Sequence, residues 1–285
     1  MVVVKHADPP AYAGGTDFKA SSANAERTDF ILLVRLTRAA LLILSLLLAI
    51  PTNSSAITTN DKRKESLKFR QLARAEVKEA EGRLAEMGYG TGRVDGVMDI
   101  VSRNALIAFQ KWEGREVTGR LNREDFDAIM TANPPLAKES GYRHVEVDLD
   151  RQVLMLIDDV GEVKRVLPIS SGSNKQYKEK GGSGLAYTPR GRFRINAKIS
   201  GWRKSPLGLL YYPSYFSGGV AIHGNPSVPH QPQSHGCIRI PMSAAVEVSK
   251  LLPVGTIVLI YDKKSFVSAE EWAEADKQKQ EAKVR

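Results

Sequence analysis

Cysteine is the residue that this sequence has least of: its 285 residues contain one, Cys237. A single cysteine excludes an internal disulfide. It does not decide the compartment, because many exported proteins carry no disulfide. Hydrophobic residues make up 42% of the chain and charged residues 26%, which is ordinary for globular proteins. A chain of this length therefore predicts two folded domains together with some sequence outside them.

Long apolar runs are also missing. Residues 39–50 are almost unbroken apolar sequence, but a transmembrane helix needs about 20 such residues. Two arginines precede this run and the small residues Ser54-Ser55-Ala56 follow it, which is the order of a secretory signal peptide. We therefore expect residues 1–56 to be a signal peptide and the protein to be exported to the periplasm or cell envelope. A retained anchor over Phe30 to Ile50 and a start site placed too early remain alternatives.

Acidic residues are too few to balance the basic ones. The chain has 41 Lys and Arg against 32 Asp and Glu, a net charge of +9. Residues 1–56 hold five basic and four acidic residues, so the remainder keeps +8. Such a charge suits acidic partners. Because an exported protein meets little nucleic acid, we expect the carboxylate-bearing cell wall or anionic lipid as the counterpart. We expect anchoring in a membrane only through the signal segment.

The residues around Cys237 indicate nucleophilic chemistry. The segment Ser234-His235-Gly236-Cys237-Ile238-Arg239 places a thiol among a histidine, a glycine and an arginine, and His223 lies fourteen positions upstream. A thiol with a pKa of about 8.5 is mostly protonated at neutral pH, so a nucleophile needs a base or a nearby positive charge. His223, His235 and Arg239 are the candidates. Gly236 allows a ligand to approach the backbone, whose N–H groups could hold an oxyanion.

Two other interpretations of Cys237 remain. A lone cysteine between alternating apolar residues can be a small buried hydrophobe. His223, His230, His235 and Cys237 are also the right ligand types for zinc. Their spacing lacks the paired short-range pattern of structural zinc sites.

The first half of the chain predicts a small all-α domain over residues 75–133, after a polar linker over residues 57–74. Apolar residues recur at helical spacing from Glu76 to Met87 and from about Asp99 to Trp112. Asn122 can cap a third helix. The Asn133-Pro134-Pro135 segment then ends the helical pattern.

Beyond the prolines the period changes from helix to strand, which predicts a mainly-β domain, a sandwich or barrel, over residues 142–262. Val220 to Ile222 is a short strand that should deliver His223 at its end. Residues 174–185 and 200–219 are expected to be long loops, and Pro241 to open a helix. Residues 263–285 are a charged, helical tail. The other expected strands are His144 to Leu149, Val153 to Ile157, Val163 to Ile169, Phe193 to Ile199 and Ile257 to Tyr261.

Residues Tyr142 to Asp262 resemble the catalytic domain of the L,D-transpeptidase family of peptidoglycan cross-linking enzymes. The resemblance rests on three segments, Ile169-Ser170-Ser171-Gly172, Tyr187-Thr188-Pro189-Arg190-Gly191-Arg192-Phe193, and His223-Gly224 with Ser234 to Arg239. Residues 75–131 are similar to the type 1 peptidoglycan-binding domain. That similarity is carried by Leu84, Gly88-Tyr89, Val94-Asp95-Gly96, Ala105-Leu106, Phe109-Gln110 and Leu121.

The resemblance implies roles for the site residues. Cys237 would be the nucleophile and His223 the base, oriented by the carbonyl of Gly224. Backbone amides of the His235-Gly236-Cys237 segment would form the oxyanion hole. The family's reaction takes a tetrapeptide stem as donor, without a cofactor or a metal. His235 and Arg239 would hold the loop or the substrate carboxylate, with Ser234 in support.

Three functions remain open on the sequence. The first is transpeptidation with peptidoglycan stems and glycan as partners. The second is hydrolysis of the same acyl-enzyme by water, which makes a carboxypeptidase or a cross-link hydrolase. The third is non-catalytic wall binding. We expect the helical domain to act as a tethered module with a shallow glycan groove beside Phe109, Trp112 and the Tyr89–Gly96 loop; a spacer without a binding role is the alternative.

Overall fold

The computed structural model describes residues 71–265. All described residues belong to one compact unit. The expected signal peptide, most of the linker and nearly all of the charged tail lie outside the described residues. None of the helices within residues 71–265 is long and apolar enough to span a membrane.

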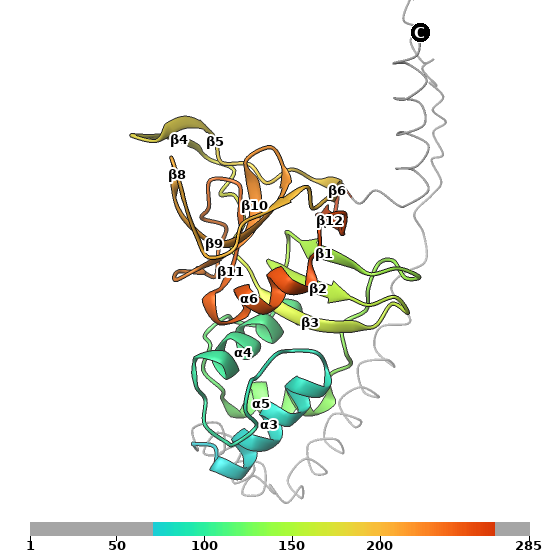
Figure 1. The fold of residues 1–285 in the computed structure, drawn as a ribbon. Helices are drawn as coiled ribbons and strands as arrows, with labels where there is room; N and C mark the ends of the chain where they lie inside the picture. The colour runs from blue at the N-terminus through green and yellow to red at the C-terminus, as the bar shows by residue number, and fades with distance from the viewer. Residues whose placement is uncertain (1–70, 266–285) are drawn as a thin grey trace, which may run out of the picture. The chain divides into compact units, whose positions relative to one another are not determined.

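Three helices open the described chain, in the places that the sequence predicts (Figure 1). They are α3 (Arg74–Glu86), α4 (Ile100–Trp112) and α5 (Arg123–Thr131). The Asp99 side chain accepts hydrogen bonds from the backbone N–H groups of Val101 and Ser102 and so caps α4. Asn122 caps α5 by accepting from the N–H of Asp125 at 2.7 Å, which confirms the predicted cap.

Two five-stranded sheets follow, and they confirm the predicted mainly-β class (Figure 1). In the first sheet, Val153 to Ile157 and Ile257 to Tyr261 form strands with the predicted bounds. The first sheet has the order β3 (Val163–Pro168), β2 (Val153–Ile157), β1 (His144–Asp148), β12 (Ile257–Tyr261), β6 (Gly191–Arg194). The second has the order β11 (Ile238–Pro241), β10 (Val220–Asn225), β9 (Gly208–Ser217), β7 (Ala197–Lys198), with β8 (Trp202–Ser205) paired to β9. The helix α6 (Met242–Leu251) follows β11 directly.

Strand β2 is buried on both faces, which explains its unbroken apolar sequence Val-Leu-Met-Leu-Ile. Leu154 and Leu156 belong to the core between the two sheets, which also includes Ile222, Ile238 and residues of α6. Val153, Met155 and Ile157 point the other way and share a second core with α3, α4 and α5. The period of two along a strand divides its side chains between these cores.

The shared core corrects our expectation of a tethered module. Phe109 of α4 is fully buried in the second core with residues of β2 and β3, and the Tyr89 ring packs edge-on against it with centroids 5.7 Å apart. The N–H of Val166 also donates to the carbonyl of Gly88 at 2.9 Å. Phe109 therefore cannot line a glycan groove. The helical segment is part of one folded body with the first sheet.

The two expected long loops are wrong: both segments form hairpins. Residues 174–185 contain β4 (Gln176–Glu179) and β5 (Gly182–Leu185), and residues 200–219 contain β8 and β9. Most side chains of β4, β5 and β8 are exposed, so these strands lack the alternation that marks a half-buried strand. The turns are two residues long, and Gly182 and Gly208 follow them with φ of +145° and +126°.

Two strand predictions also differ from the structure by more than one residue. The expected strand from Phe193 to Ile199 is interrupted, because β6 lies in the first sheet and β7 in the second, with Ile195 and Asn196 crossing between them. His223 lies within β10 and not at its end, since this strand continues to Asn225.

Candidate active site

Parallel pairing of β10 and β11 brings the two halves of the site together. The register aligns Ile222 with Ile238 and His223 with Arg239. Cys237 immediately precedes β11, so its side chain lies beside β10. Cys237, His223 and Arg239 line one cavity of about 520 Å³ together with Ser234 and His235. The structure thus brings the expected nucleophile Cys237, the expected base His223 and the cation Arg239 into one pocket, although His223 lies fourteen residues before Cys237.

The His223 ring is buried and oriented by its own neighbour. Its Nδ1 lies 2.9 Å from the carbonyl oxygen of Gly224. A carbonyl can only accept, so Nδ1 carries the proton and Nε2 keeps a free lone pair. Burial is the main cause that lowers the pKa of His223 to about 4, and the charge of Arg239 lowers it further, against the Gly224 hydrogen bond, which raises it. The ring is therefore neutral at neutral pH and available as a base.

Gly224 packs closely against side chains of α6. A Cβ at this position would lie 2.6 Å from the Cβ of Ala245 and 3.1 Å from a ring carbon of Tyr211. Only glycine fits between β10 and these side chains. The carbonyl that orients His223 is therefore held on a rigid backbone.

The Cys237 thiol is partly buried and donates a weak hydrogen bond to the carbonyl of Gly219, with an S···O distance of 3.8 Å. Burial raises its pKa above the ordinary value, against a backbone hydrogen bond at Ala221 and the charge of Arg239, which lower it. The thiol is therefore protonated at neutral pH. The resting pair is a neutral thiol and a neutral imidazole, so a proton must move to His223 as the sulfur attacks.

Ser234 shapes the loop that carries the thiol. Its buried hydroxyl donates to the carbonyl of Cys237 at 2.5 Å and accepts from the N–H of Gly236 at 3.0 Å. The Gly236 amide is therefore already engaged inside the loop. Of the three amides expected to form the oxyanion hole, this leaves those of His235 and Cys237 as candidates.

Thr188 is a structural residue of the site to which the sequence analysis assigned no role. Its fully buried hydroxyl donates to the carbonyl of Gly236 at 2.7 Å and accepts from the N–H of Gly172 at 2.8 Å. Gly236 has a φ of +142°, and a Cβ there would lie 2.8 Å from the carbonyl oxygen of Tyr187. The Tyr187-Thr188-Pro189-Arg190 segment therefore holds the cysteine loop in place. The only sign of this role in the sequence was that Thr188 lies in the family motif from Tyr187 to Phe193.

His235 lines the cavity, but its hydrogen bond is to Glu179. Its Nε2 lies 2.9 Å from Oε1 of Glu179 on β4, and its ring packs edge-on against Tyr177 with centroids 4.6 Å apart. A Cβ on Gly181, in the turn after β4, would lie 2.0 Å from the carbonyl oxygen of Pro206 in the β8–β9 turn. The two hairpins therefore touch at their turns and form one wall of the cavity, to which His235 connects the cysteine loop.

Arg239 gives the cavity a positive charge. Its backbone is fixed by two hydrogen bonds with Ser170, at 3.1 and 3.0 Å. Its side chain is half-buried, and burial lowers its pKa. The cavity is also lined by Arg203 and Lys204 but by no aspartate or glutamate. Within residues 71–265, Arg239 forms no ion pair with a carboxylate. The pocket therefore suits a ligand that carries a carboxylate.

The zinc interpretation requires His230 beside the other three residues. His230 lines a different cavity, of about 740 Å³, together with Trp112, Arg115 and Arg151. In the described part of the chain, no group of three or more His, Cys, Asp or Glu residues is placed to hold a metal ion.

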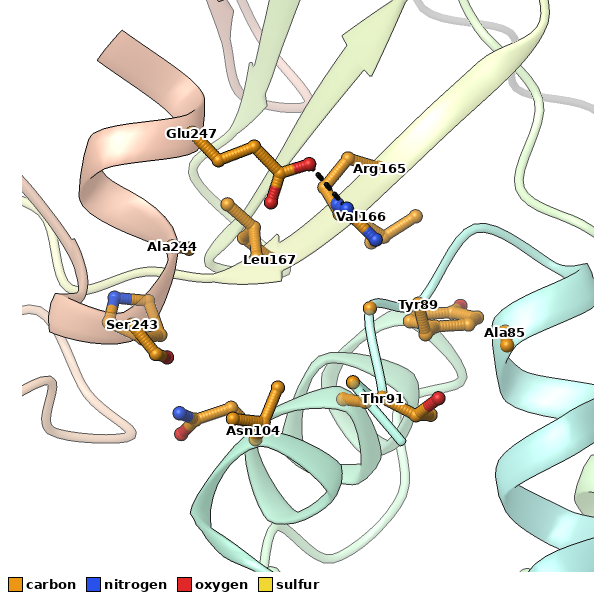
Figure 2. A pocket seen from close by; sticks show the side chains of 15 residues that line it. Ala85, Tyr89, Thr91, Asn104, Arg165, Val166, Leu167, Ser243, Ala244 and Glu247 are labelled. Atoms are coloured by element: carbon orange, nitrogen blue, oxygen red, sulfur yellow. Dashed lines mark hydrogen bonds and ion pairs between the residues drawn. The ribbon is translucent and has the colours of Figure 1, made fainter. Parts of the chain in front are cut away.

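A further cavity, of about 360 Å³, lies where the helical segment meets β3 and α6. Figure 2 shows Tyr89, Thr91 and Asn104 on its helical side, and Leu167, Ser243 and Ala244 opposite them. An ion pair between Arg165 and Glu247 lies at the same place (Figure 2). No cysteine or histidine lines this cavity, so it is separate from the thiol site.

Comparison with known proteins agrees with the two-part organisation. Residues 142–260 match the model of the L,D-transpeptidase catalytic domain, and residues 73–129 match the model described as "Putative peptidoglycan binding domain". No curated protein sequence matches the chain significantly.

Among solved structures, one shows the same family at 36% identity. The L,D-transpeptidase (residues 123–326) from Xylanimonas cellulosilytica is 36% identical, with a TM-score of 0.62, and the match covers 65% of this chain and 93% of that one. An L,D-transpeptidase from Stackebrandtia nassauensis is 23% identical with a TM-score of 0.40, covering 65% of this chain and 90% of that one. One from Mycobacterium smegmatis is 26% identical with a TM-score of 0.33, covering 42% and 58%.

Proposed function

Because the chain belongs to the L,D-transpeptidase family, we propose that it is an exported cysteine L,D-transpeptidase that joins peptidoglycan stems through a thioester on Cys237. The single observation that carries this proposal is that Cys237 and a buried, neutral His223 line one cationic cavity. The match to a peptidoglycan-binding domain supports peptidoglycan as the partner.

The first half-reaction is acylation of Cys237. As Sγ attacks the carbonyl carbon of the third residue of a tetrapeptide stem, the thiol proton passes to Nε2 of His223. The oxyanion that forms is held by backbone N–H groups, for which Cys237 and His235 are the candidates. The C–N bond to the terminal D-alanine then breaks, and His223 returns its proton to the leaving amine. The products are free D-alanine and a thioester on Cys237.

The second half-reaction repeats these steps with a new amine. An amine of another stem attacks the thioester carbonyl, His223 takes its proton, and the C–S bond breaks to restore the thiol. The Gly224 carbonyl stabilises the imidazolium that forms in each half, because it accepts the Nδ1–H bond throughout. Water in place of the amine would give the carboxypeptidase reaction with the same residues.

Arg239 and the hairpin wall are proposed to bind the donor. Arg239 follows Cys237 by two residues, pairs with His223 in the β10–β11 register, and lines the same cavity as the thiol. It would take a carboxylate of the stem, with Arg203 and Lys204 adding to the positive field. His235 would keep the β4 side of the wall in place through Glu179. It then acts on binding more than on proton transfer.

Incubation of the purified protein with defined tetrapeptide muropeptides tests the function. Cross-linked dimers together with released D-alanine identify a transpeptidase. Tripeptide products identify a carboxypeptidase, and loss of existing cross-links identifies a hydrolase. Cys237→Ala should give none of these products. Unchanged muropeptides in the presence of a chemically intact Cys237 would overturn the proposal.

Export is part of the proposal and has its own test. We propose that the signal segment, residues 1–56, is removed, which leaves a chain with a charge of +8 to meet the acidic wall. N-terminal sequencing of the protein from the cell envelope should begin close to residue 57. A start upstream of Arg35 would make the segment a retained anchor.

A further inference from the structure

Lys111 is a buried lysine on α4 that reaches into the β-rich part of the chain. The residue is 6% exposed. Its Nζ donates to the carbonyl oxygen of Ile169 at 2.7 Å and lies 3.4 Å from that of Gln152. A buried ammonium ordinarily pairs with a carboxylate, but these two bonds are to the backbone. The helical segment thus holds a specific point of the catalytic domain.

That point is a junction that Gln152 assembles. Gln152 follows β1 with a left-handed φ of +55°, and its carbonyl accepts from the N–H of Ile169 at 3.0 Å. Its side-chain Oε1 accepts from the N–H of Ser171 at 2.9 Å, and its Nε2 donates to the Ser171 hydroxyl at 2.8 Å. Lys111 donates to carbonyls on both sides of this junction, so the ammonium fastens Gln152 to the end of β3.

The same strand end holds both flanks of Cys237. On one side, the backbone carbonyl of Ser171 accepts from the N–H of Ser234 at 2.9 Å, and the N–H of Ser173 donates to the backbone carbonyl of Ser234 at 3.0 Å. On the other side, Ser170 exchanges two backbone hydrogen bonds with Arg239. The Ser234 hydroxyl in turn donates a hydrogen bond to the carbonyl of Cys237. A continuous path of hydrogen bonds therefore runs from the Lys111 ammonium to the residues on either side of the thiol.

We propose that Lys111 is a positioning residue for Cys237: the helical segment, through this ammonium, fixes the strand end on which the cysteine loop is bonded. The role is distinct from wall binding, and its effect on turnover rests on the proposed function. It makes the helical segment part of the catalytic apparatus.

Burial disfavours the charged form of the Lys111 amine, and this guides the choice of test variant. Desolvation lowers the pKa of Lys111 to about 7. Methionine has a similar length and no charge, so Lys111→Met removes the donor without leaving a large cavity or a buried ion. Lys111→Met therefore tests the effect of the hydrogen bonds on the cysteine loop separately from a general loss of stability. Lys78→Met on the exposed face of α3 is the matched control.

The experiment compares full-length wild type, Lys111→Met and Lys78→Met by hydrogen exchange and by donor kinetics. In Lys111→Met, we expect the amides of Ser171 and Ser234 to exchange at least tenfold faster. We expect kcat for the donor to fall about tenfold with KM changed less than twofold, and the melting temperature to stay within a few degrees of wild type. Lys78→Met should match wild type in every readout.

Unchanged exchange at Ser171 and Ser234 would overturn the proposal, and so would an unchanged kcat. A loss of kcat that only follows a lower melting temperature would also overturn it, because Lys111 would then be a packing residue. Hydrogen exchange needs no substrate. If wild type fails to form an acyl adduct while Lys111→Met still loosens the loop, the proposed function fails and the structural coupling stands.

Discussion

Nδ1 of His223 lies 2.9 Å from the carbonyl oxygen of Gly224, the next residue in β10. The backbone of the strand therefore sets the tautomer of the ring that lines the same cavity as the thiol. Catalytic histidines are commonly oriented by a carboxylate. Here the orienting group is a peptide carbonyl, held in place because α6 leaves room only for glycine at position 224.

His223→Ala should slow acylation of Cys237 about 10²- to 10⁴-fold, the usual contribution of a positioned general base. His235→Gln should lose much less and mainly raise KM, because His235 bonds Glu179 on the hairpin wall. Single-turnover acylation by a tetrapeptide donor measures both. A larger rate loss in His235→Gln than in His223→Ala would reverse the two roles.

The acid limb of kcat/KM should lie near pH 4 and not near pH 6.5. Burial lowers the pKa of His223 to about 4, so the base stays neutral and active until the pH falls to that value. Burial also raises the pKa of the Cys237 thiol, so its alkylation by iodoacetamide should have a midpoint above the ordinary 8.5. A preformed thiolate–imidazolium pair would instead give fast alkylation that is independent of pH from 5 to 8.

Stability should rise with pH between about 7 and 10.5 because of Lys111. Its pKa is lowered to about 7 in the fold from 10.5, so in this window the unfolded state binds more protons than the native state. Unfolding free energy then increases as pH increases. Urea denaturation of wild type and Lys111→Met at pH 7 and pH 10 measures it. The increase in unfolding free energy from pH 7 to pH 10 should be smaller in Lys111→Met. Equal increases in the two proteins would contradict a lowered pKa for Lys111.

Deletion of residues 75–133 should abolish folding of the catalytic part. It would uncover Val153, Met155, Ile157 and Val166, which pack against the helices. Phe109→Ala is a milder version and should cost about 3–5 kcal/mol. Solubility, melting temperature and turnover of a soluble donor are the measurements. A truncated protein that is monomeric and fully active would show that the helical segment is a removable module after all.

The sequence was most informative where a pattern is local. Asn122 predicted a helix cap, the run Val153 to Ile157 predicted a strand, and both are found. The family motif placed Cys237 and His223 in one site, and the two side chains line one cavity. These features depend on neighbours in the chain or on a shared motif.

The features that were missed depend on contacts between distant segments. Phe109 looked available for glycan because its burial depends on β2, which lies more than forty residues away. The hairpins over residues 174–185 and 200–219 were missed because most side chains of β4, β5 and β8 are exposed and show no apolar alternation. The link from Lys111 to Ile169 has no signature in sequence, since a lysine on a helix is usually solvated.

The thioester on Cys237 is tested most directly by the intact mass of the protein after exposure to a tetrapeptide donor, followed by mapping of the modified residue. We expect one acyl group per chain, a mass gain equal to the donor less D-alanine, attached to Cys237 and absent from Cys237→Ala. A full adduct on Cys237→Ala, or an adduct on any other residue of the wild type, would contradict it.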